Sequence, residues 1–349
     1  MLEFPGDVSV VIVAHNARST LPATLDALSA AGCPFSRITL VDVASTDGTA
    51  QWLAERFPEV RVRRLDDNRG PGPGRNVGIR EASSPYVLLM DADVAVEPDI
   101  VQHLRAAMAR DPAIAVASPI VVHAGRPDVI QYAGTGLHFI CEAVNPWCDR
   151  PLADRGSEPQ EIGCASTCAL LIARNAAIRV GLFDERYFIG KEDGDFTHRI
   201  RLAGYRIVEL PWARVRHQSR PRSAWLFYYQ IRNRWHFMLK NYEWRTLISI
   251  LPVLVVHEAL QCVVLIWKGH GRMYLRAVAG LVRMLPALPA DRALVRRIRV
   301  VHDATLLRTD PMVARDDLVG SPRMRRAKAA YERALAAYWR LLTRTVLPR

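Results

Sequence analysis

Cysteine is scarce in this chain and is never arranged in the paired form that holds zinc. The 349 residues include six cysteines, and no two of them are spaced as C-x-x-C. Cys164 and Cys168 lie closest together, but no second pair follows to complete a set of four ligands. We therefore expect thiols of the core or of loops, and no zinc site.

The first residues lack the features of a signal peptide. The stretch MLEFPGDVSVVIVAHN carries acidic residues where a basic region would stand, and it has no long apolar core. We therefore expect a protein of the reducing cytosol. The chain also shows no internal repeat and no low-complexity tract.

The glycine-rich segment GPGPGRNVG (70–78) lacks the pattern of a phosphate-binding P-loop, and no G-x-G-x-x-G follows the first predicted strand. We predict a loop that leads into a helix, with glycines that let the backbone approach a ligand. Arg75 would contact phosphate, and Asn76 would fix the loop. The alternative is a plain surface turn.

Acidic residues are outnumbered by basic ones. The chain has 47 Lys and Arg against 35 Asp and Glu, a formal charge of +12, and residues 290–349 hold 14 of the former and 6 of the latter. Such a surplus suits nucleic acid, an anionic membrane surface or phosphorylated ligands, and does not choose among them. Half of the residues are hydrophobic, which excludes a disordered chain.

Short apolar runs alternate with helical patterns over the first hundred residues, which predicts βαβ units and a mainly parallel sheet in an α/β fold. The expected strands lie at 8–16, 37–45, 60–65 (an outer strand) and 87–96. The following part is less regular. There we expect a strand at 169–173, a helix at 196–203 and a strand at 206–210.

Residues 246–267 are apolar for long enough to cross a bilayer. Three polar residues and an early proline argue against a clean span: His257, Glu258, Gln261 and Pro252. With basic residues on both sides, an in-plane interfacial helix fits better, and a buried helix is the alternative. Residues 324–346 form a basic amphipathic pattern with Tyr and Trp, which also suits a membrane surface.

Two carboxylates, Asp91 and Asp93, end the apolar run VLLMDADVAV. If the strand continues, both face the same way, because residues i and i+2 share a face. Ligands of open α/β sheets bind at the carboxyl ends of strands, so a divalent cation is a candidate there. The alternative is a capped strand end with solvated acids.

Polar residues also follow the first two predicted strands. Ala14 and Asn16 end the first, and Asp42 ends the second. A carboxylate can accept the imide hydrogen of uracil or thymine, and Asp47 in the next turn could hold the ribose side. The alternative is that Asp42 and Asp47 are turn and N-cap acids.

The segment GKEDGDF (190–196) places Glu192, Asp193 and Asp195 just before a predicted helix. Such acids often only compensate the helix dipole, but a carboxylate beside a hydroxyl can serve as a general base. His217 ends a basic, strand-like segment. An imidazole beside two aspartates makes a plausible Mn²⁺ or Mg²⁺ site, although a lone histidine is more often structural.

In their order and spacing, the elements VSVVIVAHN, LVDVASTDGT, GPGPGRNVGI, VLLMDADV, GKEDGDF and RVRHQS resemble family 2 glycosyltransferases over roughly residues 7–220. The segment YYQIRNRWHFMLKNY (228–242) resembles the part that follows the catalytic domain in the bacterial rhamnosyltransferase-like branch. The ordered set carries the resemblance, and no single element does.

The resemblance implies an A-type glycosyltransferase fold, with a mixed, mainly parallel sheet flanked by helices. It implies a nucleotide-sugar-binding catalytic domain over 1–225 and a helical, basic, membrane-associating region over 226–349. The reaction would be an inverting, metal-dependent transfer of sugar from a UDP-, dTDP- or GDP-sugar to a hydroxyl acceptor.

The resemblance also assigns residues. Asp193 would be the general base and Glu192 would position the acceptor, while Asp93 and His217 would hold Mn²⁺ or Mg²⁺. Donor-binding residues would be Ala14, Asn16, Asp42, Asp47, Arg75, Asp91 and Ala92. The sequence departs from the family at Val43 and Ala44, where Asn and Gly or Ser are common, and at His15, where Tyr or Phe usually precedes Asn.

The acceptor is expected to be lipid-linked or presented at a membrane, and the protein to be peripheral on the cytoplasmic face of the membrane. A cytosolic small-molecule acceptor remains an alternative. Two other functions compete. One is a nucleotidyltransferase that makes sugar nucleotides, although its glycine loop should follow the first strand. The other is a catalytically silent protein of membrane surfaces or nucleic acids, but no aromatic-interleaved RNA-binding pattern is present.

Overall fold

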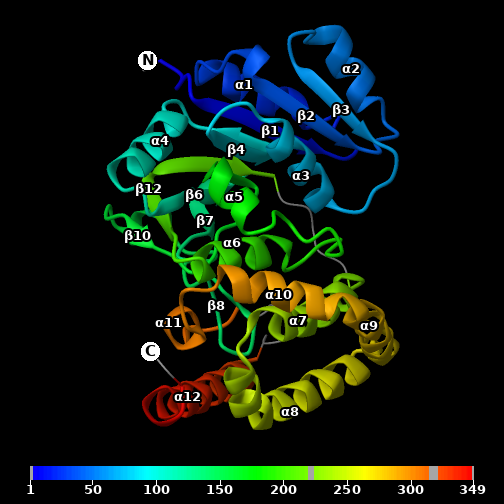
Figure 1. Ribbon diagram of the computed structural model, residues 1–349, viewed down its shortest axis with the longest axis vertical. Coiled ribbons are helices and arrows are strands. Elements are labelled where there is room, and N and C mark those ends of the chain that lie inside the picture. Colours follow the sequence, from blue (N-terminus) through cyan, green and yellow to red (C-terminus); the bar gives the residue numbers. More distant parts are fainter. Residues whose placement is uncertain (1–2, 219–223, 314–320, 348–349) are drawn as a thin grey trace.

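The computed structural model describes residues 3–218, 224–313 and 321–347. A sheet with helices on both faces forms one end of the elongated molecule, and a group of helices forms the other (Figure 1). The strands are β1 (Val8–Ala14), β2 (Ile38–Val43), β3 (Arg61–Leu65), β4 (Tyr86–Asp91), β5 (Val94–Val96), β6 (Ile114–His123), β7 (Arg126–Tyr132), β8 (Gly136–Leu137), β9 (Ala143–Val144), β10 (Gln160–Glu161), β11 (Ala169–Ala173) and β12 (Arg206–His217).

The helices run from the first crossover to the C-terminal end of the described chain. They are α1 (Leu21–Ala30), α2 (Thr49–Arg56), α3 (Pro71–Glu81), α4 (Ile100–Arg110), α5 (Arg174–Arg179), α6 (Glu192–Leu202), α7 (Leu226–Asn241), α8 (Trp244–Trp267), α9 (Gly271–Met284), α10 (Leu288–Ile298), α11 (Asp303–Leu306) and α12 (Pro322–Thr345).

The main sheet has the order β10-β12-β6-β11-β4-β1-β2-β3, with β5 beside β12 and β7 beside β6. Strands β1, β2, β3 and β4 pair in parallel, as do β6 and β12, whereas β11 runs antiparallel to both of its neighbours. The prediction of a mixed, mainly parallel sheet flanked by helices is confirmed, and β3 is the outer strand that was expected.

Strand β1 is buried on both faces because it lies inside the sheet. Val10 and Ile12 join a core that α1 and α4 complete on one side. Val11 and Val13 join the opposite core, to which α3, α5 and α6 contribute. This two-sided cover explains why the run shows no alternation of apolar and polar residues.

The glycine-rich segment 70–78 is not the loop that we expected, because α3 begins at Pro71. A Cβ at Gly78 would lie 2.2 Å from Val11 Cγ1, and one at Gly74 would lie 3.1 Å from Val13 Cγ1. The glycines therefore let the helix axis approach the sheet. Proline is tolerated in a first helical turn, where its missing N–H has no intrahelical partner to lose.

Three other expected boundaries shift. Helix α6 begins at Glu192 rather than Phe196, so the acids lie inside its first turn. Strand β12 continues to His217. Strand β4 ends at Asp91, and the chain turns before β5 leaves to pair with β12.

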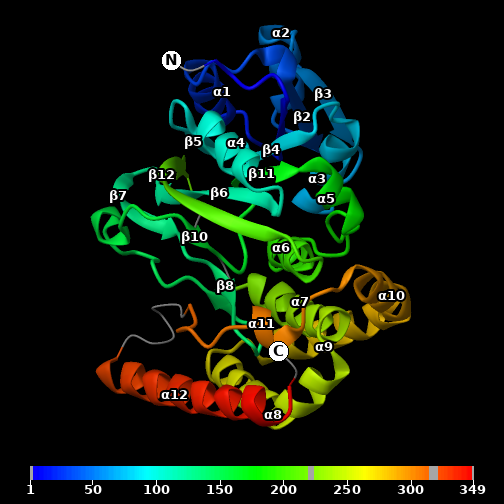
Figure 2. The same ribbon diagram turned by 60° about the vertical axis from the view of Figure 1, so that its left-hand side comes forward.

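The C-terminal helices pack on one another and on the β8–β9 hairpin (Figures 1 and 2). Their separation from the catalytic part at residue 225 stays a prediction; residues 219–223 beside that boundary lie outside the described part. Ile298 of α10 joins the core under the sheet.

Helix α8 is long and apolar enough to cross a membrane by length and composition. Its polar residues turn inward: Glu258 and Gln261 meet Arg234 of α7, and His257 meets Tyr331 of α12. The polar residues that interrupt the apolar run thus bind neighbouring helices of the protein.

The cysteines behave as expected for core and loop thiols. All six are free, and four are buried. Burial raises the pKa of Cys164 to about 11 and of Cys168 to about 12, which keeps both thiols protonated at neutral pH.

Candidate active site

The carboxyl ends of β1, β2 and β4 lie side by side and bring the predicted donor-binding residues together. In the parallel register, Ala14 is opposite Asp42, and Val13 is opposite Asp91. The crevice outside the carboxyl ends of such strands is the usual ligand site of an open α/β sheet.

The turn after β1 and the turn after β2 are held together by hydrogen bonds. Asn16, at a left-handed φ of 51°, accepts a hydrogen bond from Thr46 N–H at 2.8 Å. Asp42 is fully buried; it accepts from Ser45 N–H and pairs with Arg64 at 3.2 Å. Ala44 is left-handed as well, with φ of 52°, a backbone conformation that favours glycine.

Asp47 has the contacts of a turn residue. Its carboxylate accepts hydrogen bonds from the N–H and hydroxyl of Thr49 and from the N–H of Arg18. These bonds occupy both oxygens and hold the 45–49 turn against the end of β1. The observed contacts give Asp47 a role in shaping the turn, and its contact with ribose stays a prediction.

Arg75 extends from α3 to the end of β4. Its side chain is 4 % exposed, and Nη2 donates to Asp91 Oδ1 at 2.8 Å. Burial alone would lower the pKa of this guanidinium, but the charge of Asp91 and its hydrogen bond to Arg75 raise it. Within the described part of the chain, Nε and Nη1 of Arg75 have no hydrogen-bond partner. Donors of this kind suit the oxygens of a phosphate.

Asp93 lies in the turn after β4, and its partner is His217. The distance from His217 Nε2 to Asp93 Oδ1 is 3.5 Å. The backbone fixes this approach, because His217 pairs with Val94 of β5 and Gln218 N–H donates to the carbonyl of Asp93. The strand does not continue through buried Ala92. The premise of a continuing strand does not hold, and Asp91 and Asp93 have different partners.

The Asp93–His217 pair fits a divalent ion. One ion could bridge two groups 3.5 Å apart with ligand bonds of about 2 Å. A carboxylate with an imidazole suits Mn²⁺, and Mg²⁺ can use the carboxylate with water and phosphate oxygens. Asp91 accepts a hydrogen bond from Arg75 of α3, so we regard it as the ion-pair partner of Arg75 and not as a ligand of the metal ion.

The first turn of α6 carries three acidic residues, Glu192, Asp193 and Asp195. Glu192 is buried and Asp193 is half-buried, and Asp193 Oδ1 accepts from the N–H of Gly194. Burial and the neighbouring charge of Asp193 raise the pKa of Glu192 to about 8. At neutral pH, Glu192 is therefore mostly protonated and can donate a hydrogen bond, and Asp193 is the accessible carboxylate.

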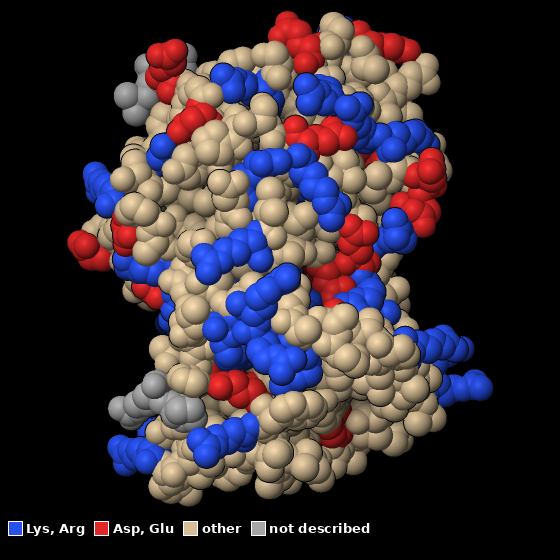
Figure 3. Space-filling model, in the orientation of Figure 1, with Lys and Arg blue, Asp and Glu red and all other residues tan. Residues whose placement is uncertain are grey.

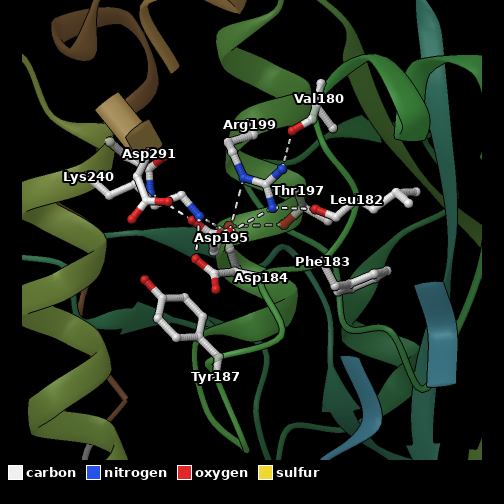
Figure 4. A network of polar contacts seen from close by, with 12 residues as sticks. Val180, Leu182, Phe183, Asp184, Tyr187, Asp195, Thr197, Arg199, Lys240 and Asp291 are labelled. Carbon is white, nitrogen blue, oxygen red and sulfur yellow. Dashed lines mark hydrogen bonds and ion pairs between the residues drawn. The ribbon is translucent and has the colours of Figure 1, made fainter. Parts of the chain in front are cut away.

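Asp195, the third acid of this turn, belongs to a buried network instead (Figure 4). It accepts hydrogen bonds from Arg199, Lys240 and Asn241. Burial alone would raise its pKa, but the charges of Arg199 and Lys240 outweigh that effect and lower it to about 2. The network fixes the helix that carries Asp193 against α7.

The same network continues to Asp184, which Lys240 and Arg186 contact at 2.8 and 2.6 Å. Asp184, His236 and Asp291 have the spacing of metal ligands. Two cationic side chains already neutralise these acids, because Arg186 also pairs with Asp291. We therefore assign this cluster to structural ion pairing.

Sequence reasoning missed two contributors. Lys240 lies in a segment noted only for its resemblance, and Gln131, whose amide oxygen lies 2.9 Å from His217 Nδ1, carried no sequence signal at all.

Comparison with known proteins places this geometry in context. Residues 9–178 match Glycosyl transferase family 2. The chain is 31 % identical over 232 residues to an N-acetylglucosaminyl-diphospho-decaprenol L-rhamnosyltransferase of Mycobacterium tuberculosis, covering 60 % of this chain and 75 % of that protein. It is 33 % identical over 138 residues to the succinoglycan biosynthesis protein ExoO of Rhizobium meliloti, covering 39 % and 38 % of the two chains.

Solved structures share the fold. Residues 1–349 of Staphylococcus aureus TarS in complex with UDP-GlcNAc align with a TM-score of 0.55 at 16 % identity, covering 96 % of this chain and 91 % of that one. GalNAc-T7 with UDP, GalNAc and Mn²⁺ aligns with a TM-score of 0.55 at 20 % identity, covering 69 % and 50 %.

Proposed function

Because this chain belongs to glycosyltransferase family 2 and is a glycosyltransferase, we propose that it moves a sugar from a nucleoside diphosphate sugar to a hydroxyl acceptor, with a divalent ion and with inversion. One observation carries the proposal. At the edge where β4 ends, the Arg75–Asp91 pair at 2.8 Å and the Asp93–His217 pair at 3.5 Å lie two residues apart along the chain. Family membership favours this function over the nucleotidyltransferase and silent-binding alternatives.

Donor binding would follow the strand ends. Ala14, Asn16 and Asp42 would line the base, with Asp47 shaping their turn, and Asp91 and Ala92 would lie near the ribose. The unpartnered donors of Arg75 would contact the diphosphate. Asp93 and His217 would hold Mn²⁺ or Mg²⁺, which when bound would neutralise charge that develops on the leaving diphosphate.

The proposed transfer needs one carboxylate that removes the proton of the acceptor hydroxyl. Asp193 would take the proton of the acceptor hydroxyl while that oxygen bonds to the anomeric carbon and the bond to the diphosphate breaks. The electron pair leaves with the nucleoside diphosphate. Attack from the face opposite the leaving group gives inversion without an enzyme nucleophile. Glu192, protonated, would donate to the acceptor and position it.

The test is Asp193→Asn. General-base help is typically worth about 10²–10⁴ in rate, so we expect transfer to fall by that factor while donor affinity changes little. Asp26→Asn, an exposed acid on α1, is the matched control and should leave transfer unchanged. An equal loss of donor affinity in Asp193→Asn would contradict the role.

We also propose a lipid-linked acceptor and a peripheral position on the cytoplasmic face of the membrane. The mycobacterial relative is named for a lipid-linked acceptor, N-acetylglucosaminyl-diphospho-decaprenol. In this chain, α8 turns an apolar face outward, with Trp267 77 % and Ile248 69 % exposed. That face continues onto α9 and is broadly free of charge in Figure 3. Its exposed apolar residues are Trp244, Ile248, Leu251, Val255, Val256, Leu260, Val263, Ile266, Trp267, Leu275, Val278 and Val282.

Charge on the neighbouring helices complements an anionic lipid surface. Exposed arginines lie on α9 and α12, namely Arg272, Arg276, Arg283, Arg323, Arg325, Arg326, Arg333, Arg340 and Arg344. Among the described acidic residues after Trp244, Asp310 is the exposed one. An apolar stripe with basic flanks is the pattern of an in-plane helix whose apolar face enters the headgroup boundary.

Vesicle co-sedimentation tests this position. Val255→Asp places a charge on the outward face of α8, and we expect binding to vesicles with anionic lipid to be lost. Ile178→Asp changes an exposed apolar residue on α5, and should leave binding intact. Equal binding by both variants would contradict the proposal.

A further inference from the structure

Gln131 occupies a bulge in β7. Along β6, Val121 pairs with Tyr132 and the next residue, Val122, pairs with Ile130, so Gln131 is the extra residue of the bulged strand. A bulge breaks strict alternation and re-aims a side chain, and such bulges are common beside active sites. Gln131 is 6 % exposed, so its buried amide needs partners.

The bulge directs the Gln131 amide to His217. Its Oε1 lies 2.9 Å from His217 Nδ1, and the other ring nitrogen, Nε2, lies 3.5 Å from Asp93 Oδ1. A carbonyl oxygen can only accept a hydrogen bond, and at 2.9 Å it lies within hydrogen-bond range of Nδ1, whereas Asp93 lies beyond the usual range from Nε2. The geometry therefore favours the neutral tautomer with its proton on Nδ1. The lone pair of Nε2 is then left facing Asp93.

Asn145 holds the bulge in place. Its Nδ2 donates to the backbone carbonyl of Gln131 at 2.7 Å, and its Oδ1 accepts from Ala133 N–H at 3.2 Å. Asn145 is itself 9 % exposed. The position of the Gln131 amide is thus set by buried hydrogen bonds on both sides of it.

We propose that Gln131 is a positioning residue that sets the tautomer and the ring orientation of His217, so that Nε2 is available to a divalent ion beside Asp93. The inference rests on the proposed metal-dependent function for its purpose, but the tautomer itself is a property of the metal-free protein. An outer partner that orients a metal-binding histidine typically changes metal affinity by about 10- to 100-fold when it is removed.

The first measurement is ¹⁵N NMR of the histidine rings in the metal-free protein, with the His217 signals identified by their loss in His217→Gln. We expect a protonated Nδ1 and a bare Nε2. Gln131→Met has a similar volume and no acceptor, and should give a mixture of tautomers with unchanged signals from His123, which pairs with Asp149 instead. Gln131→Glu restores an acceptor and should restore the single tautomer.

The second measurement is the Mn²⁺ affinity of the same proteins, determined by isothermal titration calorimetry. The midpoint of thermal unfolding checks that each variant is folded. We expect a 10- to 100-fold loss for Gln131→Met relative to wild type, and recovery in Gln131→Glu. A wild-type His217 protonated on Nε2, or Mn²⁺ affinity unchanged in Gln131→Met, would overturn the inference while leaving the proposed function standing. Absence of Mn²⁺ binding by the wild type would count against the proposed function, and the NMR result would then decide the inference alone.

Discussion

Arg75 Nη2 lies 2.8 Å from Asp91 Oδ1 and joins helix α3 to the end of strand β4. The pair neutralises an acid at the donor edge and leaves two further guanidinium donors without a partner among the described residues. A family whose donor carries a diphosphate has an evident use for such a cation.

Replacing Arg75 should slow sugar transfer both because a positive charge is lost and because the paired N–H donors of the guanidinium are lost. In Arg75→Met we expect the transfer rate to fall by about 10²–10³, the usual loss when one donor to developing charge is removed. Arg75→Lys keeps the charge but not the fork of donors, so it should recover only part of the rate. Steady-state kinetics measure both, and full activity in the lysine variant would contradict a role for the fork.

Stability should depend on pH through Glu192. Its pKa rises from 4.5 to about 8 on folding, so between these values the folded protein holds a proton that the unfolded chain has lost. The free energy of unfolding should therefore fall as pH rises through this window. Glu192→Gln cannot lose a proton and should flatten the slope. Denaturant unfolding at several pH values measures it, and identical slopes in the two proteins would contradict the burial argument.

Gly78 should tolerate no side chain. A Cβ there would lie 2.2 Å from Val11 Cγ1, so Gly78→Ala must push α3 away from the sheet and move Arg75 with it. We expect a loss of about 1–3 kcal/mol in stability, as for other overpacked cores, together with reduced transfer. Gly125→Ala meets nothing within 4 Å and should change stability by less than about 0.5 kcal/mol. Thermal or denaturant unfolding compares the two.

Lys240 should be far more important to stability than a surface lysine. It is 3 % exposed and contacts Asp184 and Asp195, so Lys240→Met would leave two buried acids short of a cation. Breaking a buried pair costs about 3–5 kcal/mol. Lys328→Met removes a lysine from an i,i+4 pair with Glu332 on α12, worth about 0.3–0.5 kcal/mol. Similar losses in both variants would contradict the network shown in Figure 4.

The sheet and the edge that carries the site could be predicted from the sequence because both follow from short-range patterns. The β-branched run of β1 and the apolar run of β4 that ends on its acids are each recognised from a few consecutive residues. The pairing of Asp93 with His217 joins two distant parts of the chain. The residue types made a metal site of aspartate and histidine plausible, but only the ordered resemblance to a family indicated that these residues would meet.

Other features depended on contacts that no local pattern records. The proline-rich start of α3 resembled a loop because the partner of its glycines, Val11, lies far away in the chain. The inward face of α8 could have been found, since Glu258, Gln261 and Leu265 recur at helical spacing. Gln131 could not, because a bulge depends on how two strands register.

The central claim is that the Asp93–His217 edge binds a nucleotide with a divalent ion, and a thermal-shift panel tests it most directly. UDP, dTDP and GDP are each added with and without Mn²⁺ to the wild type and to Asp93→Ala. A ligand that binds only the native state at 100 times its dissociation constant stabilises it by about 2.7 kcal/mol, which is easily seen. We predict a Mn²⁺-dependent shift with one nucleotide, lost in Asp93→Ala. No shift with any nucleotide, or the same shift in Asp93→Ala, would contradict the account.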